Sequence, residues 1–183
     1  MRFKQLWHGI QSWLLDWRSH ALTLLTLLLV YAGMHLWQTR HLPSGPAPAF
    51  SAPAAGPQAG RVLDFEQWRN SHPGRAMALH FWADWCPICR AEENSISRLQ
   101  QNWPVLGVAM QSGDAAHVQA VLHHRSLDWL TVIDPDGALA RRYGLSSVPA
   151  FIVIDAQGRI RFADVGYTTE AGMRLRLWWA QTF

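Results

Sequence analysis

Cysteine is scarce in this chain. Only Cys86 and Cys89 occur among 183 residues, and they lie three positions apart. A structural disulfide stabilises a fold mainly by closing a long loop, and a loop of two intervening residues constrains almost nothing. The pair is therefore predicted to take part in chemistry rather than to staple the fold.

Long runs of like charge are also missing. The formal net charge is only +3, and no run of five or more basic residues occurs. Such runs are typical of nucleic-acid-binding segments, so the sequence gives no indication of a nucleic-acid partner. The hydrophobic fraction of 49% excludes a chain that is disordered throughout.

One stretch has no charged residue at all. Residues 21–37 read ALTLLTLLLVYAGMHLW. A helix of that length approaches the roughly 30 Å of a bilayer core, so we expect a transmembrane anchor over residues 21–38. A cleaved signal peptide, with small residues at 47–49, and a buried core helix are the alternatives.

Basic residues predict the orientation of this anchor. Arg2, Lys4 and Arg18 precede it in the N-terminal flank 1–20, whereas only Arg40 follows it closely. Positive residues stay on the cytoplasmic side, so the N-terminus is expected in the cytoplasm and everything after residue 40 outside it, with the chain crossing the membrane once.

Residues 39–60 are rich in proline and alanine, reading PSGPAPAFSAPAAGPQAG from position 43. Such a composition buries little apolar surface, and proline keeps the backbone extended. We expect a linker here, followed by one folded domain over residues 61–183.

Alternating strand and helix patterns fill that domain, and a hairpin and a last helix close it. This order predicts an α/β sandwich of three layers around a mixed central sheet. Strands are expected at 76–82, 105–110, 130–133, 151–154 and 159–165, and helices at 64–70, 88–101, 114–124, 138–143 and 169–181.

The two cysteines lie where a predicted strand ends and a predicted helix begins. The N-terminus of a helix stabilises an anion, so Cys86 is expected to be an exposed nucleophilic thiolate. Pro87 suits the first helical turn, and Cys89, one turn on, is placed to resolve a mixed disulfide. Half of a zinc site is the alternative, but no second cysteine pair is present.

These motifs resemble those of a known family. Trp82-Ala83-x-Trp85-Cys86-x-x-Cys89, followed by Ser147-Val148-Pro149-Ala150-Phe151, is similar to thioredoxin. With the anchor and Glu92, the chain resembles the TlpA/ResA/CcmG group of tethered thiol–disulfide oxidoreductases, and within it the suppressor-of-copper-sensitivity (ScsD) proteins.

The resemblance implies a thioredoxin-like fold and a periplasmic reductant of protein disulfides. It also implies an inner-membrane anchor with the catalytic domain in the periplasm, a membrane electron donor of the DsbD or ScsB type, and a role in copper tolerance. We expect no cofactor and no metal. Pro149 matches the family's cis-proline, which with Val148 binds the substrate backbone. Trp82 and Trp85 border the cysteine motif and are expected to shape the same surface with Pro87.

Glu92 and His80 are candidate proton-transfer residues. Glu92 lies three residues after Cys89, which on a helix returns it to the same face. His80 lies six residues before Cys86, and its predicted strand points it inward, where its pKa range suits acid–base work. A solvated glutamate and a core histidine bonded to a backbone carbonyl are the alternatives.

Several functional questions stay open at this level. An oxidase or isomerase is the alternative to a reductase, because the residues Pro87, Ile88 and Val148 do not fix the direction of transfer. A copper-binding protein that uses the cysteine pair, and a structural tether, are the other classes. The substrate protein and the oligomeric state are not predicted.

Overall fold

The computed structural model describes residues 17, 19–34 and 45–183. Most of the predicted flank 1–20, the end of the predicted anchor at 35–38, and the first part of the predicted linker lie outside the described residues. The chain divides into two units, residues 1–40 and 41–183, which are described separately.

The first unit contains a helix over the described residues 17 and 19–34. Its apolar side chains are exposed, from Leu25 at 53% to Tyr31 at 69%. The hydroxyls of Thr23 and Thr26 each donate to the carbonyl four residues earlier, at 2.8 Å. Among the described residues, no helix combines the length and the apolar character needed to cross a membrane. The anchor over 21–38 therefore stays a prediction.

The second unit is built on a mixed sheet of eight strands with the order β1-β8-β7-β4-β5-β6-β2-β3. β4, β5 and β6 are parallel, and the remaining neighbours in the sheet are antiparallel. The strands are β1 (Gly45–Pro46), β2 (Ser51–Ala55), β3 (Val62–Asp64), β4 (Met77–Trp82), β5 (Val105–Met110), β6 (Thr131–Asp134), β7 (Ala150–Ile154) and β8 (Arg159–Val165).

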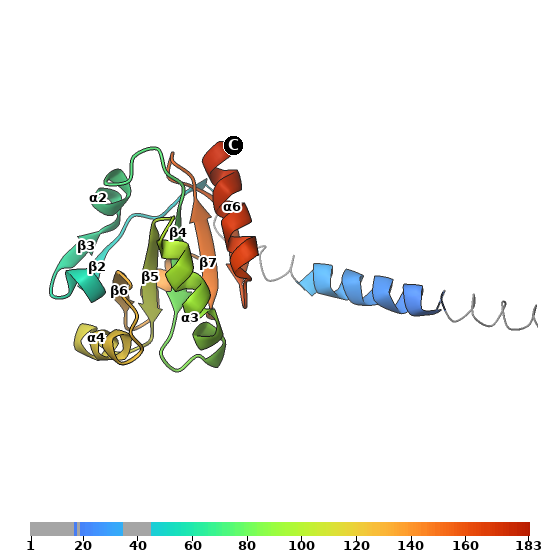
Figure 1. Cartoon of the computed structure of the whole chain (residues 1–183), viewed down its shortest axis with the longest axis horizontal. Coiled ribbons are helices and arrows are strands. Elements are labelled where there is room, and N and C mark those ends of the chain that lie inside the picture. The colour runs from blue at the N-terminus through green and yellow to red at the C-terminus, as the bar shows by residue number, and fades with distance from the viewer. Residues whose placement is uncertain (1–16, 18, 35–44) are drawn as a thin grey trace, which may run out of the picture. The chain divides into compact units, whose positions relative to one another are not determined.

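Helices cover both faces of this sheet (Figure 1). One apolar core lies under α3, α4 and α6, and the other lies under α2 and α5. The helices are α2 (Phe65–Asn70), α3 (Pro87–Gln100), α4 (Ala115–His124), α5 (Ala138–Arg142) and α6 (Glu170–Thr182), with a short 3-10 turn at Gly56–Gln58. The predicted α/β sandwich with a mixed sheet is confirmed.

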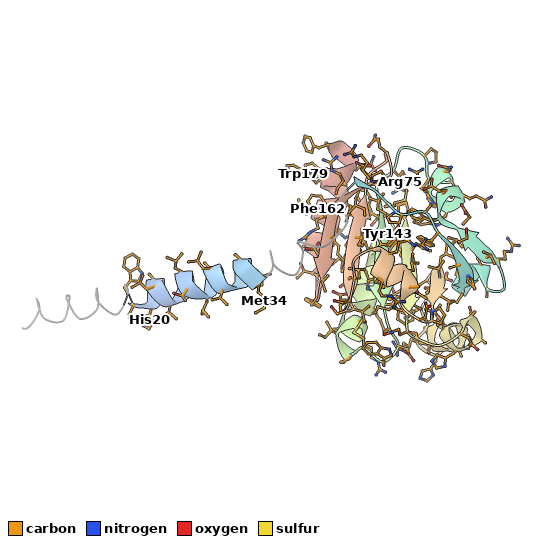
Figure 2. The ribbon with its side chains drawn as sticks, turned by 180° about the vertical axis from the view of Figure 1, so that it is seen from behind. His20, Met34, Arg75, Tyr143, Phe162 and Trp179 are labelled. Carbon is orange, nitrogen blue, oxygen red and sulfur yellow. A yellow bond between two sulfur atoms is a disulfide. The ribbon has the colours of Figure 1, made fainter. Side chains whose placement is uncertain are left out.

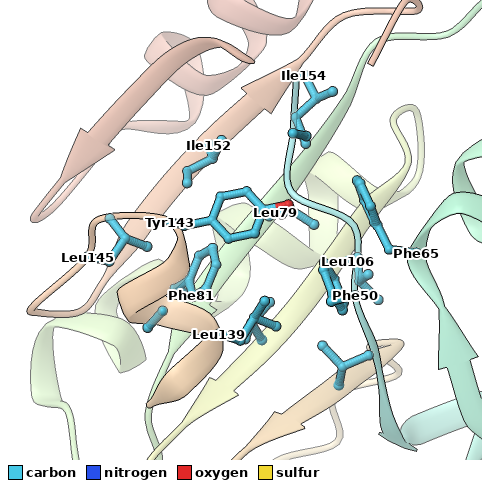
Figure 3. Packing of buried hydrophobic residues seen from close by; sticks show 14 of the residues in the cluster. Phe50, Phe65, Leu79, Phe81, Leu106, Leu139, Tyr143, Leu145, Ile152 and Ile154 are labelled. Atoms are coloured by element: carbon cyan, nitrogen blue, oxygen red, sulfur yellow. The ribbon is translucent and has the colours of Figure 1, made fainter. Parts of the chain in front are cut away.

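Strand β4 divides its side chains between the two cores. Leu79 and Phe81 pack in the core shown in Figure 3, against Tyr143 of the turn after α5. Successive side chains of a strand point to opposite faces, so His80 and Trp82 face the other core, beneath α3. This alternation brings His80 to the side of the sheet that carries the cysteines.

The linker prediction for residues 39–60 is wrong for 45–60, which belong to the folded unit. β1 pairs with β8, and β2 lies between β6 and β3. Phe50 is buried and stacks on Phe65 with ring centroids 4.9 Å apart. The Tyr143 hydroxyl donates to the Pro48 carbonyl at 2.8 Å. Composition was misleading because Phe50 and long-range strand pairing hold the segment against the sheet, where Ala54 and Ala55 are buried as well.

The elements predicted between 64 and 181 are confirmed, with ends that agree or are shifted by one residue. Asp64 caps α2 by accepting from the Gln67 N–H at 2.8 Å, and Asp114 caps α4 in the same way through the His117 N–H. The hairpin of β7 and β8 turns at residues 155–158, where Gly158 has a φ of +81° that favours glycine.

Candidate functional site

The two cysteines form a disulfide at the junction of β4 and α3. Cys86 is the N-cap of α3, and its sulfur accepts from the Cys89 N–H at 3.1 Å. Pro87 occupies the first helical position, where its missing N–H removes no helical hydrogen bond. The backbone donor and the helix N-terminus both stabilise negative charge on Cys86, so the two sulfurs are electrostatically unequal.

The expectation that Cys86 is exposed is wrong for this disulfide form. Cys86 is 3% exposed and Cys89 is 2% exposed, so accessibility does not distinguish the two sulfurs. The first turn of α3 folds both side chains against the apolar core beneath it. What distinguishes Cys86 is the hydrogen bond from the Cys89 N–H and its contact with the loop described next.

A proline loop lies against the Cys86 sulfur. The Val148–Pro149 peptide bond is cis, as the resemblance implies. The Val148 carbonyl oxygen lies 3.8 Å from Cys86 Sγ, and the Pro149 carbonyl accepts from the Gly166 N–H at 2.8 Å. Val148 is partly exposed whereas Pro149 is buried, so the loop presents Val148 at the surface beside the reactive sulfur.

Exposed apolar side chains surround the disulfide. Trp85 is 58% exposed, Ile88 48% and Tyr167 57%, and Pro87 is exposed between the first two. The Trp85 indole N–H donates to the Gln111 carbonyl at 3.1 Å, which fixes its orientation. These side chains give the entrance to Cys86 an apolar rim that suits an unfolded or extended polypeptide.

Trp82 does not border the site, contrary to the expectation. It is 1% exposed and packs edge-on against Trp129, with ring centroids 5.7 Å apart. Strand alternation explains the difference: Trp82 is the last residue of β4 and points into the core under α3, whereas Trp85 follows the end of the strand.

Beneath the disulfide lies a buried pair of ionisable side chains. His80 is fully buried and Glu92 is 1% exposed, and His80 Nε2 lies 3.5 Å from Glu92 Oε2. Glu92 Oε1 accepts from the Thr168 N–H at 2.5 Å. Neither ring nitrogen of His80 has a hydrogen-bond partner, and its ring lies edge-on to Trp129 at 5.7 Å. The structure therefore brings the two predicted residues together.

The pair belongs to the same core region as the resolving cysteine. Glu92 follows Cys89 by one turn of α3, and both side chains are buried. Neither alternative for these residues holds: Glu92 is not solvated, and His80 donates to no backbone carbonyl. A buried carboxylate beside an imidazole can accept or release one proton without contact with bulk water.

A second, more exposed polar cluster holds the loop before Cys86, and the sequence analysis did not identify it. Asp84 Oδ2 lies 2.9 Å from His117 Nε2, and the Asp84 carbonyl accepts from Arg125 Nη2 at 2.8 Å. Partial burial raises the pKa of Asp84, but hydrogen bonds from His117 and Ser112 outweigh it and hold this pKa below its ordinary value.

The missed residues carry only weak signals in the sequence. Asp84 lies inside the tryptophan–cysteine motif, and that position was the one available indication. His117, Arg125 and Thr168 come from distant segments, and only the tertiary fold places them beside the motif. His123 and His124 are exposed on α4, as expected for a pair that does not chelate.

Comparison with curated proteins finds thiol–disulfide proteins. A "thioredoxin-like protein" of Haemophilus influenzae is 31% identical over 106 residues, which are 57% of this chain and 63% of that protein. The thiol:disulfide interchange protein DsbE of Pseudomonas aeruginosa is 29% identical over 161 residues, 84% of this chain and 85% of that protein. This chain thus spans less than two thirds of the Haemophilus relative.

Comparison with solved structures and family models gives the fold and the family. A thiol:disulfide interchange protein of the thioredoxin family from Chlorobium tepidum superposes with a TM-score of 0.62 and 21% identity, covering 76% of this chain and 97% of that one. The AhpC/TSA family model matches residues 43–163, so it includes most of the segment expected to be a linker. The chain therefore belongs to the AhpC/TSA family and has a thioredoxin-like fold.

Proposed function

We propose that this protein is a protein thiol–disulfide oxidoreductase in which Cys86 exchanges disulfides with client proteins and Cys89 resolves the intermediate. The observation that carries the proposal is the hydrogen bond from the Cys89 N–H to Cys86 Sγ at the start of α3, beside the Val148–Pro149 loop. The names of the Haemophilus and Pseudomonas relatives support the same activity.

The reduction of a client disulfide is a balanced exchange of two bonds. The Cys86 thiolate attacks one client sulfur, a mixed disulfide forms, and the other client sulfur leaves as a thiolate that takes up a proton. The Cys89 thiolate then attacks Cys86 Sγ, the second client sulfur leaves, and the Cys86–Cys89 disulfide forms. Two electrons pass from the protein to the client, and the reverse sequence would oxidise a client dithiol.

The client is held beside Cys86 by backbone and apolar contacts. Val148 borders the sulfur, and Trp85, Ile88 and Tyr167 offer exposed apolar surface around it. Pro87 is exposed at the start of α3 and belongs to the same surface, whereas Pro149 is buried behind Val148 and shapes the loop through its cis peptide bond. An extended segment lying along this loop would bring its disulfide to Cys86 despite the burial of both cysteines.

Glu92 and His80 take up the proton that Cys89 loses before it attacks. Cys89 is buried, so a base buried beside it is better placed than bulk water to take up the proton of its thiol. Glu92 is one helical turn from Cys89. His80 would share the proton with Glu92, because its Nε2 lies 3.5 Å from Glu92 Oε2. Their burial together, away from solvent, supports this role.

The direction and place of the reaction follow from the family resemblance. We propose a reductant, recharged by a membrane donor of the DsbD or ScsB type, with the catalytic domain in the periplasm and an anchor over residues 21–38. The closeness to the TlpA/ResA/CcmG group and to ScsD proteins, and a role in copper tolerance, belong to this proposal. The reduction potential tests direction: a value near thioredoxin's roughly −270 mV supports a reductant, and one near DsbA's roughly −120 mV an oxidant.

The metal-binding alternative gains no support from the described residues. Among residues 17, 19–34 and 45–183, no three His, Cys, Asp or Glu side chains gather as a metal site would require.

Trapping of the intermediate tests the mechanism. A Cys89→Ser variant should accumulate a covalent complex with reduced and partly reoxidised insulin, seen as a band that dithiothreitol removes. Cys86→Ser should form no such complex, because the remaining thiol, Cys89, has neither the backbone N–H donor nor the contact with the Val148–Pro149 loop that distinguish Cys86. Both variants should lose insulin reduction by at least about 10³-fold. Equal trapping by the two variants would overturn the assignment of Cys86 as the nucleophile.

A further inference from the structure

Four large apolar side chains are exposed on the outer face of α6 and at the residue that follows it. Leu175 is 61% exposed, Trp178 52%, Trp179 46% and Phe183, which follows the helix, 67%. We call these four residues the aromatic patch. The rings of Trp178 and Trp179 both contact the ring of Phe183, at 6.3 and 4.8 Å between centroids. Figure 2 shows Trp179 at the periphery of the domain.

The aromatic patch does not contribute to the core of its own domain. The opposite face of α6 provides that contribution through Met173, Leu177 and Ala180, all buried. A surface helix normally presents polar residues on its outer face, and a contiguous exposed apolar patch marks a binding surface. Trp178 and Trp179 are therefore available for contact with a partner surface.

The patch lies where the chain enters the folded unit. Gly45 of β1 is opposite Ile160 of β8, and the next residue, Arg161, donates from Nη1 to the Phe183 carbonyl at 3.4 Å. The predicted anchor ends at 38, and six residues, 39–44, separate it from Gly45. Seven residue steps reach at most about 25 Å, so an anchored domain must hold Gly45 within that distance of the bilayer.

The same end of the domain is opposite the redox site. Gln181 of α6 binds the Ala76 N–H and the Gly74 carbonyl, immediately before β4 begins. The cysteines follow the other end of β4, whose six residues span about 17 Å. A surface that covered the aromatic patch would therefore leave Cys86 and its apolar rim accessible.

We propose that the aromatic patch rests in the headgroup region of the lipid bilayer, so that the domain stands on the membrane with Cys86 directed away from it. This inference rests on the proposed anchor. Tryptophan prefers the boundary between lipid and water, because its indole combines a large apolar ring with one N–H donor. The short chain segment from residue 38 to Gly45 keeps the domain close to the bilayer, and the two adjacent tryptophans provide affinity for its headgroup region.

Hydroxyl-radical footprinting of the full chain in lipid nanodiscs tests the proposal. Discs of phosphatidylcholine and phosphatidylglycerol would carry one copy each, and mass spectrometry would locate the oxidised residues. Trp85, at 58% exposure, is the internal control for Trp178 and Trp179 at 52% and 46%. We expect the patch tryptophans to be oxidised at least fivefold more slowly than Trp85. Rates within twofold of Trp85 would overturn the proposal.

Further measurements distinguish contact with the bilayer from contact between two copies of the chain, and failure of the patch proposal from failure of the anchor proposal. Protection that appears only with two copies in a disc would overturn the proposal in favour of contact between copies. A chain that alkaline carbonate washes off the disc would overturn the anchor and the patch together, whereas a retained chain with oxidised patch tryptophans would overturn the patch alone. Insulin reduction in solution reports separately on the proposed redox function.

Variants provide a second readout. In discs with brominated lipids, the Trp178→Ser/Trp179→Ser variant should lose most of the lipid quenching that the domain's tryptophans show, and should still reduce insulin within twofold of the unmodified chain. Val62→Ser removes a more exposed apolar side chain, 70% exposed on the edge strand β3, and should keep the quenching. Unchanged quenching in the double tryptophan variant would contradict contact between the aromatic patch and the lipid.

Discussion

Two histidine–carboxylate pairs flank the same redox motif in opposite environments. His117 and Asp84 lie at the rim, 2.9 Å apart, with side chains 53% and 24% exposed. His80 and Glu92 lie beneath the disulfide, 3.5 Å apart, with side chains 0% and 2% exposed. The shorter distance belongs to the pair that water screens, so distance alone does not rank the two pairs.

Burial makes the pair with the longer distance, His80 and Glu92, the one whose loss should cost more stability. A solvent-exposed ion pair contributes about 0–1 kcal/mol, because water screens the attraction and the side chains lose freedom. Removing one member of a buried pair costs about 3–5 kcal/mol, because the other is left in the interior without compensation. The pair of His117 and Asp84 is thus suited to hold the loop before Cys86. The pair of His80 and Glu92 is suited to move a proton, because an uncompensated charge is costly only in the buried interior.

The same substitution in both histidines gives the largest expected contrast in stability. His80→Ala opens space beside Trp129 and leaves Glu92 buried without its neighbour, so the free energy of unfolding should fall by about 3 kcal/mol. His117→Ala should lower it by less than about 1 kcal/mol. Urea unfolding of each variant, followed by circular dichroism at neutral pH, measures the difference. Equal losses in the two variants would show that burial does not separate the pairs.

The buried carboxylate should matter more for the rate of exchange than any other acid on its helix. Glu92→Gln keeps an oxygen to accept the Thr168 N–H but cannot take up the proton of Cys89. Resolution of a preformed mixed disulfide at Cys86 should slow by about 10²-fold, the lower end of what a positioned base contributes. Stopped-flow fluorescence with a labelled client peptide measures this step.

Glu93→Gln is the matched control for that substitution. Glu93 is the next residue of α3, but it pairs with Arg125 at 2.7 Å on the side of the helix that leads to the rim. Its loss should change the resolution rate by less than about threefold. A rate for Glu92→Gln that matched this control would contradict a role for the buried pair in proton transfer, and normal thiol titration in His80→Ala would remove His80 from that role.

Local signals made most of the fold predictable. The apolar runs at 76–82 and 105–110, the caps Asp64 and Asp114, and the hairpin turn at 155–158 each depend on neighbouring residues only. The segment 45–60 could not be predicted in this way. Its order comes from Phe65, Tyr143 and β6, which are distant in the sequence, and its own composition is typical of an unfolded spacer.

In the candidate site, too, the predictable features depend on neighbouring residues and the unpredictable ones on distant residues. The cysteine pair and Pro149 are identified by spacing and motif, and strand alternation correctly directs His80 inward. The burial of Cys86 and the pairing of His80 with Glu92 depend on how α3 lies on β4, which no short motif specifies. Asp84 acquires its partners from α4 and from the residues on either side of that helix, so its role was not predictable.

The smallest expected effect is the acid sensitivity of the rim pair. The pKa of Asp84 is held below its ordinary 3.8, so the folded state favours the charged carboxylate more than the unfolded chain does. That stabilisation is complete above pH 3.8 and is lost as the pH falls through the lower folded-state pKa. The stability difference between the unmodified chain and Asp84→Asn should therefore shrink below that pH, by less than about 1 kcal/mol because water screens the pair. Urea unfolding at a series of pH values measures it. In His117→Ala, which lacks one of the groups that lower this pKa, the shrinkage should be smaller, and an unchanged pH dependence there would assign the shift to Ser112 instead.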